Sequence, residues 1–274
     1  MTKYIIRIKN GDNFTYKNSK KEDIERIKKL RIPPMWNNVK IDPNPNSKIQ
    51  ATGYDSKNRK QYIYNKDFVE KKKNLKFKKI NSFDYKKYNK VINYYINKKD
   101  LSKNCVIANI IKLMEDLNIR VGNETYKKEN GSYGITTLQK KHLKGDVLIF
   151  IGKKGIEHKK NITNKNSLEF IKKILSIKGP DLFYDSSGNK INSKDLNDFL
   201  KTKIQENITC KDIRTYSANK IFLDYMKKNK KGITENERKK NVLEGIDYTS
   251  KELGNSRKIC RDSYLNPENI NKFL

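Results

Sequence analysis

The sequence predicts an α+β protein with a small, mainly β N-terminal domain over residues 1–75 and a larger, mainly α domain over residues 76–274 that carries a small β-sheet. Two observations predict this division. Near the N-terminus, short alternating segments are separated by turn residues, whereas apolar residues further along recur at helical spacing. Between them, residues 70–79 form a basic, weakly apolar run that we interpret as the link between the domains.

The N-terminal domain is predicted to begin with a hairpin and a short helix. Residues 3–8 and 13–16 alternate around an Asn-Gly pair, which hairpin turns favour. Residues 21–30 follow as a helix. Trp36, the only tryptophan, is expected to anchor the core of this domain.

A polar turn then leads into a predicted strand that carries Gln61, Tyr62 and Tyr64, with Arg59 just before it. We expect the amide, phenol and guanidinium groups to share one exposed face, where they could contact base edges and phosphates. An edge strand with ordinary aromatic pairing would explain the same residues, and composition alone leaves both interpretations open.

Helical spacing of apolar residues recurs through the larger domain. It predicts helices over residues 86–97, 104–119, 166–176 and 234–253, another after Ser193, and one from near Thr209. Arg120 directly follows the second of these, which we expect to end at Val121 and Gly122. Arg214 is predicted within the first turns of the helix from Thr209, where free backbone N–H groups favour an anion.

The small sheet of the larger domain is predicted from three segments: residues 134–138, 147–151 and 156–163. The turn between the last two places Lys153 at the tip of a hairpin, where its ammonium group could reach outward. Without further information, Lys153 could equally be one more solvated lysine.

The charge balance predicts a polyanionic partner. The chain has 62 Lys and Arg against 31 Asp and Glu, a formal net charge of +31. Such a cationic field attracts phosphate backbones. A membrane is the competing polyanion, but there is no run of 18 apolar residues and no signal-peptide pattern, so we expect no membrane partner and a cytoplasmic location.

Arginine is rare among these cations. Only nine of the 62 basic residues are Arg, and a planar guanidinium fork matches two oxygens of one phosphate better than an ammonium group does. The three cysteines include no close pair, and the two histidines lie among lysines. These patterns predict no disulfide framework, no metal site and no cofactor.

The sequence around Tyr264 favours a reactive phenol. Arg257, Lys258 and Arg261 precede it closely, and cations favour a phenolate over a phenol that normally titrates near pH 10. A tyrosine that merely covers apolar surface would have the same neighbours. Phosphoryl chemistry without a metal needs a nucleophile and several cationic or hydrogen-bonding groups. The chain offers such a set at wide separation: Arg120, Lys153, Arg214, Asn255 and Tyr264.

Seven segments, in this order and spacing, resemble the type IB DNA topoisomerases of the small poxvirus-like group, which includes bacterial and giant-virus members. They are residues 32–36, 49–64, 119–126, 134–138, 150–153, 211–216 and 253–267. The resemblance runs almost end to end. It implies the fold that type IB topoisomerases share with tyrosine recombinases, with residues 76–274 as the catalytic domain.

The resemblance implies that Tyr264 attacks a backbone phosphodiester and forms a 3′-phosphotyrosyl bond. Arg120 and Arg214 would contact the non-bridging oxygens, and Lys153 would donate a proton to the leaving 5′-oxygen. Asn255 would hydrogen-bond a non-bridging oxygen. Poxvirus members carry His at that position, so this chain departs from them there and resembles the bacterial type; Asn has no titration of its own.

The resemblance further implies a monomer that clamps around double-stranded DNA and relaxes supercoils without ATP. Residues 1–75 would form the clamping domain, and six side chains would contact the DNA: Arg59, Gln61, Tyr62, Tyr64, Tyr126 and Lys211. The setting would be a bacterial nucleoid, or a virion or host cell if the source is viral.

Two other functions remain as alternatives. A tyrosine recombinase uses the same nucleophile, but it usually carries His-x-x-Arg where this chain has Lys211 to Arg214, and it lacks the segment from Gly53 to Tyr64. A non-enzymatic DNA-coating protein would explain the charge alone. It would not explain why Arg120 and Arg214 fall in the family motifs.

Overall fold

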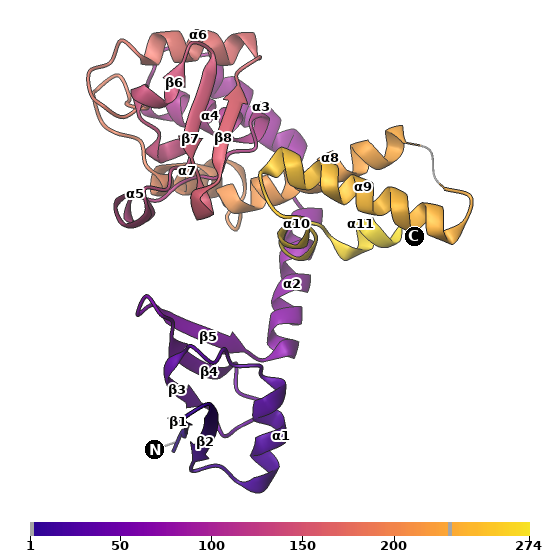
Figure 1. Ribbon diagram of the computed structural model, residues 1–274. Helices are drawn as coiled ribbons and strands as arrows, with labels where there is room; N and C mark the ends of the chain where they lie inside the picture. The colour runs from indigo at the N-terminus through magenta and orange to yellow at the C-terminus, as the bar shows by residue number, and fades with distance from the viewer. Residues whose placement is uncertain (1–2, 230–231) are drawn as a thin grey trace. The chain divides into compact units, whose positions relative to one another are not determined.

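A computed structural model describes residues 3–229 and 232–274 of the chain (Figure 1). The chain forms two compact units, one extending to Lys78 and the other running from Lys79 to Leu274. The division falls within helix α2 (Lys66–Asn81), so the basic run over residues 70–79 is helical. No helix in the described ranges is both long and apolar enough to cross a membrane.

The N-terminal unit is an antiparallel five-stranded sheet in the order β2-β1-β3-β4-β5. Its elements are β1 (Ile5–Asn10), β2 (Asn13–Lys17), α1 (Lys21–Lys29), β3 (Asn37–Ile41), β4 (Ile49–Tyr54) and β5 (Lys60–Tyr64). The core joins α1 to the sheet through Ile27, Ile5 and Ile41, and Trp36 packs against it. Hairpin, helix and final strand therefore lie where the alternating and helical patterns predict them.

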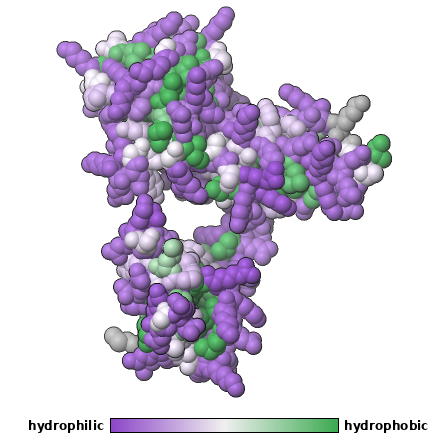
Figure 2. Space-filling model, viewed as in Figure 1, coloured by the Kyte–Doolittle hydropathy of each residue, from purple (hydrophilic) through white to green (hydrophobic). Residues whose placement is uncertain are grey.

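The larger unit is mainly helical and contains a three-stranded antiparallel sheet in the order β6-β7-β8. Its helices are α3 (Tyr85–Ile96), α4 (Lys103–Asp116), α5 (Glu124–Asn130), α6 (Lys165–Ile174), α7 (Ser193–Phe199), α8 (Cys210–Lys228), α9 (Glu235–Leu253), α10 (Arg257–Ser263) and α11 (Pro267–Asn271). The strands are β6 (Leu143–Lys144), β7 (Val147–Ile151) and β8 (Glu157–Asn161). Both units bear mostly hydrophilic side chains on the face drawn in Figure 2, where apolar atoms form small patches.

Helix α4 organises the core of this unit. It is buried on nearly every side, and Ile107, Ile110 and Ile111 belong to the largest apolar cluster. The helix ends at Asp116, earlier than the apolar pattern predicts. Asn118 adopts the left-handed conformation, with a φ of 51°, which ends the helix, and Ile119 continues the apolar pattern outside it.

The prediction of a strand over residues 134–138 is wrong. Ile135–Thr137 form a 3₁₀ turn, η1. The Ile135 and Thr136 amides donate to the carbonyls of Arg120 and Val121 at 2.8 and 2.9 Å, so this segment crosses the chain that follows α4 without entering the sheet. Its β-branched residues are buried there, and burial rather than strand pairing accounts for the apolar pattern.

Candidate active site

Arg120 is held where the chain leaves α4. Gly134 packs directly on this backbone, because a Cβ at position 134 would lie only 2.6 Å from the Arg120 carbonyl oxygen. The half-buried Arg120 side chain then donates a hydrogen bond from Nη2 to Oδ1 of Asn255, 135 positions further along the chain. Two of the predicted site residues are therefore in direct contact.

Arg214 lies in the second turn of α8 and is only 5% exposed. Its Nη1 donates to the carbonyl oxygen of Asn118, and its Nη2 donates to that of Leu253 at 2.5 Å. The guanidinium thus ties the end of α4 to the end of α9. Burial lowers the pKa of Arg214 to about 10, which still leaves the group charged at neutral pH.

The guanidinium carbon of Arg214 lies 5.5 Å from the centroid of the Tyr264 ring. Tyr264 caps the C-terminal end of α10 and is 9% exposed. Its backbone carbonyl accepts a 2.8 Å hydrogen bond from Asn219, and the Asn219 Oδ1 in turn accepts from the Asn266 amide. The buried amide of Asn219 therefore fixes the backbone on both sides of Leu265.

The surroundings lower the pKa of the Tyr264 phenol. Burial alone would raise it, but the charge and hydrogen bond of Arg214, followed by those of Arg120, outweigh the desolvation. The expectation that the cations just before Tyr264 have this effect is wrong for Arg257. Arg257 is exposed and paired with Asp247 at 2.5 Å, so the decisive cations come from α8 and from the segment after α4.

Two buried hydrogen-bond donors at this site have no partner among the described residues, namely Nε of Arg214 and Nδ2 of Asn255. Such groups destabilise a fold unless something satisfies them. Arg214 lies against the Tyr264 ring, and Asn255 accepts from Arg120, whose charge also acts on the phenol. The two free donors therefore suit an anionic ligand with several acceptor oxygens. A phosphodiester has two non-bridging oxygens of this kind.

Lys153 occupies the turn between β7 and β8, as the sequence predicts. It begins the short turn η3 (Lys153–Gly155), in which Lys154 adopts a φ of 66° and so reverses the chain. The Lys153 side chain is exposed, and none of the hydrogen bonds described above for Arg120, Arg214 or Asn255 involves it. The geometry therefore gathers four of the five predicted catalytic residues and leaves Lys153 on a neighbouring hairpin.

In the N-terminal unit, β5 places Tyr62 and Tyr64 on one exposed face, with ring centroids 6.1 Å apart. Gln61 alternates with them and so lies on the opposite face, contrary to the prediction of one shared face. Asp55, which sequence reasoning missed, accepts from Gln61 at 3.0 Å and pairs with Arg59 at 2.7 Å. The positions of Arg59 and Gln61 in the sequence did not indicate that both would bind Asp55.

The remaining two predicted DNA contacts are exposed in the larger unit. Tyr126 lies in α5 and is 57% exposed. Ion pairs hold the N-terminal half of this helix, since Lys127 lies 3.0 Å from Asp181 and Lys190 lies 2.7 Å from Glu124. Lys211 is exposed in the first turn of α8.

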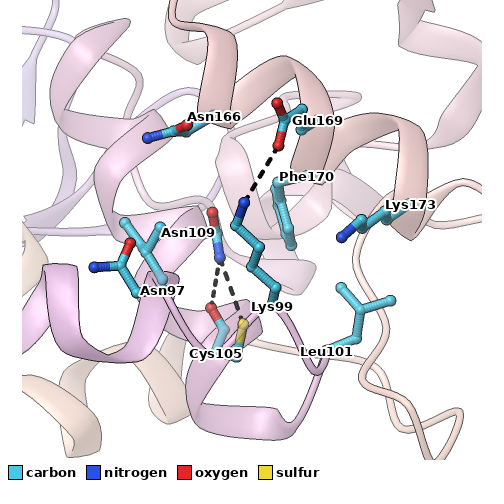
Figure 3. A pocket seen from close by; sticks show the side chains of 10 residues that line it. Asn97, Lys99, Leu101, Cys105, Asn109, Asn166, Glu169, Phe170 and Lys173 are labelled. Atoms are coloured by element: carbon cyan, nitrogen blue, oxygen red, sulfur yellow. Dashed lines mark hydrogen bonds and ion pairs between the residues drawn. The ribbon is translucent and has the colours of Figure 1, made fainter.

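A separate pocket between α3, α4 and α6 has a volume of about 30 Å³, enough for a water molecule but not for a nucleotide (Figure 3). Asn109 donates to the Cys105 carbonyl at 2.9 Å, and Lys99 pairs with Glu169 at 3.7 Å. None of the predicted site residues lines it.

Comparisons with known proteins agree with the geometry of the larger unit. The family model for the catalytic core of eukaryotic DNA topoisomerase I matches residues 58–273, and that for the N-terminal domain of bacterial DNA topoisomerase IB matches residues 14–55. DNA topoisomerase 1B of Acanthamoeba polyphaga mimivirus is 36% identical over 95% of this chain and 84% of its own length.

Two poxvirus proteins are more distant. DNA topoisomerase 1B of vaccinia virus (strain Copenhagen) is 31% identical, and DNA topoisomerase I of monkeypox virus is 30% identical. Each match covers 80% of this chain and 70% of the relative. One family model spans most of the chain, and one relative is 36% identical along nearly all of it. The chain therefore belongs to the type IB DNA topoisomerases, isomerases that relax supercoiled DNA by transient cleavage of one strand.

Proposed function

We propose that Tyr264 is the nucleophile of this relaxation reaction and that Arg120, Arg214, Asn255 and Lys153 serve the same phosphodiester. The observation that carries the proposal is the buried charge of Arg214 beside the Tyr264 ring, together with unpaired donors on Arg214 and Asn255. A buried cation beside a phenol both favours the phenolate and attracts the phosphate that it attacks.

In the proposed step, the Tyr264 phenol loses its proton to solvent and its oxygen attacks the phosphorus. The bond from phosphorus to the 5′-oxygen breaks, and its electron pair goes to that oxygen, which takes a proton from Lys153. Arg120, Arg214 and Asn255 donate to the non-bridging oxygens as charge shifts in the transition state. The product is a 3′-phosphotyrosyl bond and a free 5′-hydroxyl strand.

Religation is the reverse step, with the 5′-hydroxyl attacking the phosphotyrosyl bond. One phosphodiester is exchanged for another, so no ATP is consumed. Between the two steps the free strand rotates and supercoils are lost. The charge stabilisation is assigned to side chains, so the proposal needs neither a metal nor a cofactor.

Residues 1–75 are proposed as a DNA-clamping domain and residues 76–274 as the catalytic domain of a monomer that closes around duplex DNA. Exposed Tyr62 and Tyr64 present a stacked aromatic surface, and Arg59 and Gln61, next to them in the sequence, are proposed as further DNA contacts. Tyr126 and Lys211 are proposed to contact the DNA from the catalytic domain. The enzyme would act on DNA in the cytoplasm, in a bacterial nucleoid or in a virus-infected cell.

The test is relaxation of supercoiled plasmid in the presence of a metal chelator and the absence of ATP. We expect complete relaxation through a ladder of topoisomers. A tyrosine recombinase would instead require paired sites and yield joined products. Binding to plasmid without any relaxation would favour the DNA-coating alternative and contradict the proposal.

Lys153→Ala is expected to slow single-turnover cleavage about 10²- to 10⁴-fold on ordinary DNA, the range for loss of a general acid. On DNA whose leaving 5′-oxygen is replaced by sulfur, the same variant should lose much less, because a thiolate leaves without a proton. Lys154→Ala, the adjacent lysine of the same turn, is the control and should cleave both substrates at nearly the normal rate. Equal slowing of Lys153→Ala on both substrates would remove the proton-donor role.

A further inference from the structure

His158 lies in β8, is only 7% exposed and pairs across the sheet with Phe150, its ring stacked on the phenyl ring with centroids 5.1 Å apart. Two glycines also lie against the ring, Gly152 from the adjoining turn and Gly254 from the end of α9. A Cβ added to Gly152 would lie 2.6 Å from the imidazole Cδ2, and one added to Gly254 would lie 2.5 Å from Cε1. The imidazole therefore fills the space between these two backbones.

These glycines immediately precede two residues of the proposed chemistry. Gly152 is followed by Lys153, and Gly254, with a φ of 58°, ends α9 and is followed by Asn255. We infer that His158 is a positioning residue for strand cleavage, its ring setting the separation of the two backbones from which Lys153 and Asn255 reach the phosphate. The inference rests on the proposed roles of those two residues.

A second contact also joins strand β8 to the end of α9. Lys160, two residues further along β8, donates a 2.9 Å hydrogen bond to the carbonyl of Glu252 in the last turn of α9. Strand β8 is thus tied to the end of α9 at two successive inward positions. The hairpin that carries Lys153 and the helix end that carries Asn255 are coupled through it.

Histidine suits this place as a neutral aromatic spacer. Burial, with smaller effects from the positive charges of Lys160, Arg120 and Arg214, lowers the pKa of His158 to about 4. At neutral pH the ring therefore adds no charge to a site already rich in cations. Its flat ring lies between Phe150 and the two glycines, so a planar ring at this position is what keeps their separation.

The test uses Gly152→Ala together with His158→Ala. The backbone angles at Gly152, φ −95° and ψ −165°, are open to alanine, so the substitution acts through its contact with the ring and not through backbone strain. Each single variant is expected to slow single-turnover cleavage by about 10-fold or more, a geometric effect of the size that misplacement produces. The double variant should be no slower than His158→Ala, because the added methyl group no longer meets a ring.

Three further measurements separate positioning from a general loss of structure. His158→Phe retains a ring and should cleave within a few-fold of the normal rate, and all variants should bind DNA with unchanged Kd. With sulfur in place of the 5′-oxygen, His158→Ala should recover part of its lost rate, because that substrate does not need Lys153. His142→Ala, the other histidine, is the matched control and should cleave normally.

The inference would be overturned if Gly152→Ala cleaved normally, if the two single effects multiplied in the double variant, or if His158→Phe were as slow as His158→Ala. It would also be overturned by equal slowing of His158→Ala on both substrates. If the unaltered enzyme itself formed no covalent adduct, the proposed function would fail instead. The two failures are therefore distinguishable.

Discussion

Tyr264→Phe is expected to bind DNA normally and to lose strand cleavage by at least about 10⁴-fold, as when an enzymatic nucleophile is removed. The substitution deletes only the phenolic oxygen. The ring keeps its place against Arg214, and the backbone keeps its hydrogen bond from Asn219. The measurement is single-turnover formation of a covalent protein–DNA adduct, with affinity determined in parallel.

The matched control for this prediction is Tyr248→Phe. Tyr248 is 46% exposed on α9 and stacks on Tyr225, away from the contacts of Arg214. It should form adduct at the normal rate. Adduct formation by Tyr264→Phe at a rate near that of the unaltered enzyme would show that another residue attacks the phosphate.

Arg214→Lys is expected to slow cleavage about 10²- to 10³-fold, the effect of losing one preorganised donor to a developing charge. Lysine preserves the positive charge but not the planar guanidinium group. In the unaltered enzyme, the Arg214 guanidinium contacts the carbonyls of Asn118 and Leu253 and the phenol at the same time. The variant should also unfold at a lower temperature, because a buried carbonyl left without its donor costs about 1–3 kcal/mol. Cleavage is therefore measured well below the unfolding temperature of the variant.

Arg257→Lys is the control for the loss of a guanidinium. Arg257 precedes Tyr264 by seven residues, yet it is exposed and its partner is Asp247. An exposed ion pair of this kind contributes little to stability. Arg257→Lys should thus have nearly normal cleavage and melting temperature, whereas equal loss in both variants would contradict the special place of Arg214.

Much of the fold could be predicted from periodicity. Apolar spacing predicted α9, which buries one face, and α4, which is buried on nearly every side, and alternation predicted the strand that carries Tyr62. The order of the motifs predicted that Arg120, Lys153, Arg214, Asn255 and Tyr264 belong to one site, and all but Lys153 lie together. The positions of helices and strands can be predicted because they depend mainly on residues close together in the sequence.

The contacts that assemble the site could not be predicted in the same way. Arg120 meets Asn255 only because the chain turns sharply at Asn118 and packs against Gly134. Nothing local distinguishes the guanidinium of Arg214, which acts on Tyr264, from that of Arg257, which does not. Such long-range choices depend on packing among segments far apart in the sequence.

Arginine rarity was a useful but incomplete guide to function. Arg7 donates to the carbonyls of Pro33 and Trp36 at 3.1 and 2.6 Å, and Arg26 donates to that of Asp42 at 2.8 Å. These two forks hold loops of the N-terminal unit together. A guanidinium satisfies several carbonyls at once, so structural demand also retains arginine in a lysine-rich chain.

In the proposed reaction, the phenol oxygen of Tyr264 forms a covalent bond with the phosphate at the cleaved position. Denaturing the enzyme during cleavage of a defined duplex, followed by digestion and mass spectrometry, measures this directly. We expect one modified peptide, with the 3′-phosphate of the cleaved strand on Tyr264 and a free 5′-hydroxyl on the released strand. A nucleotide attached to any other residue, or attached through a 5′-phosphate, would contradict it.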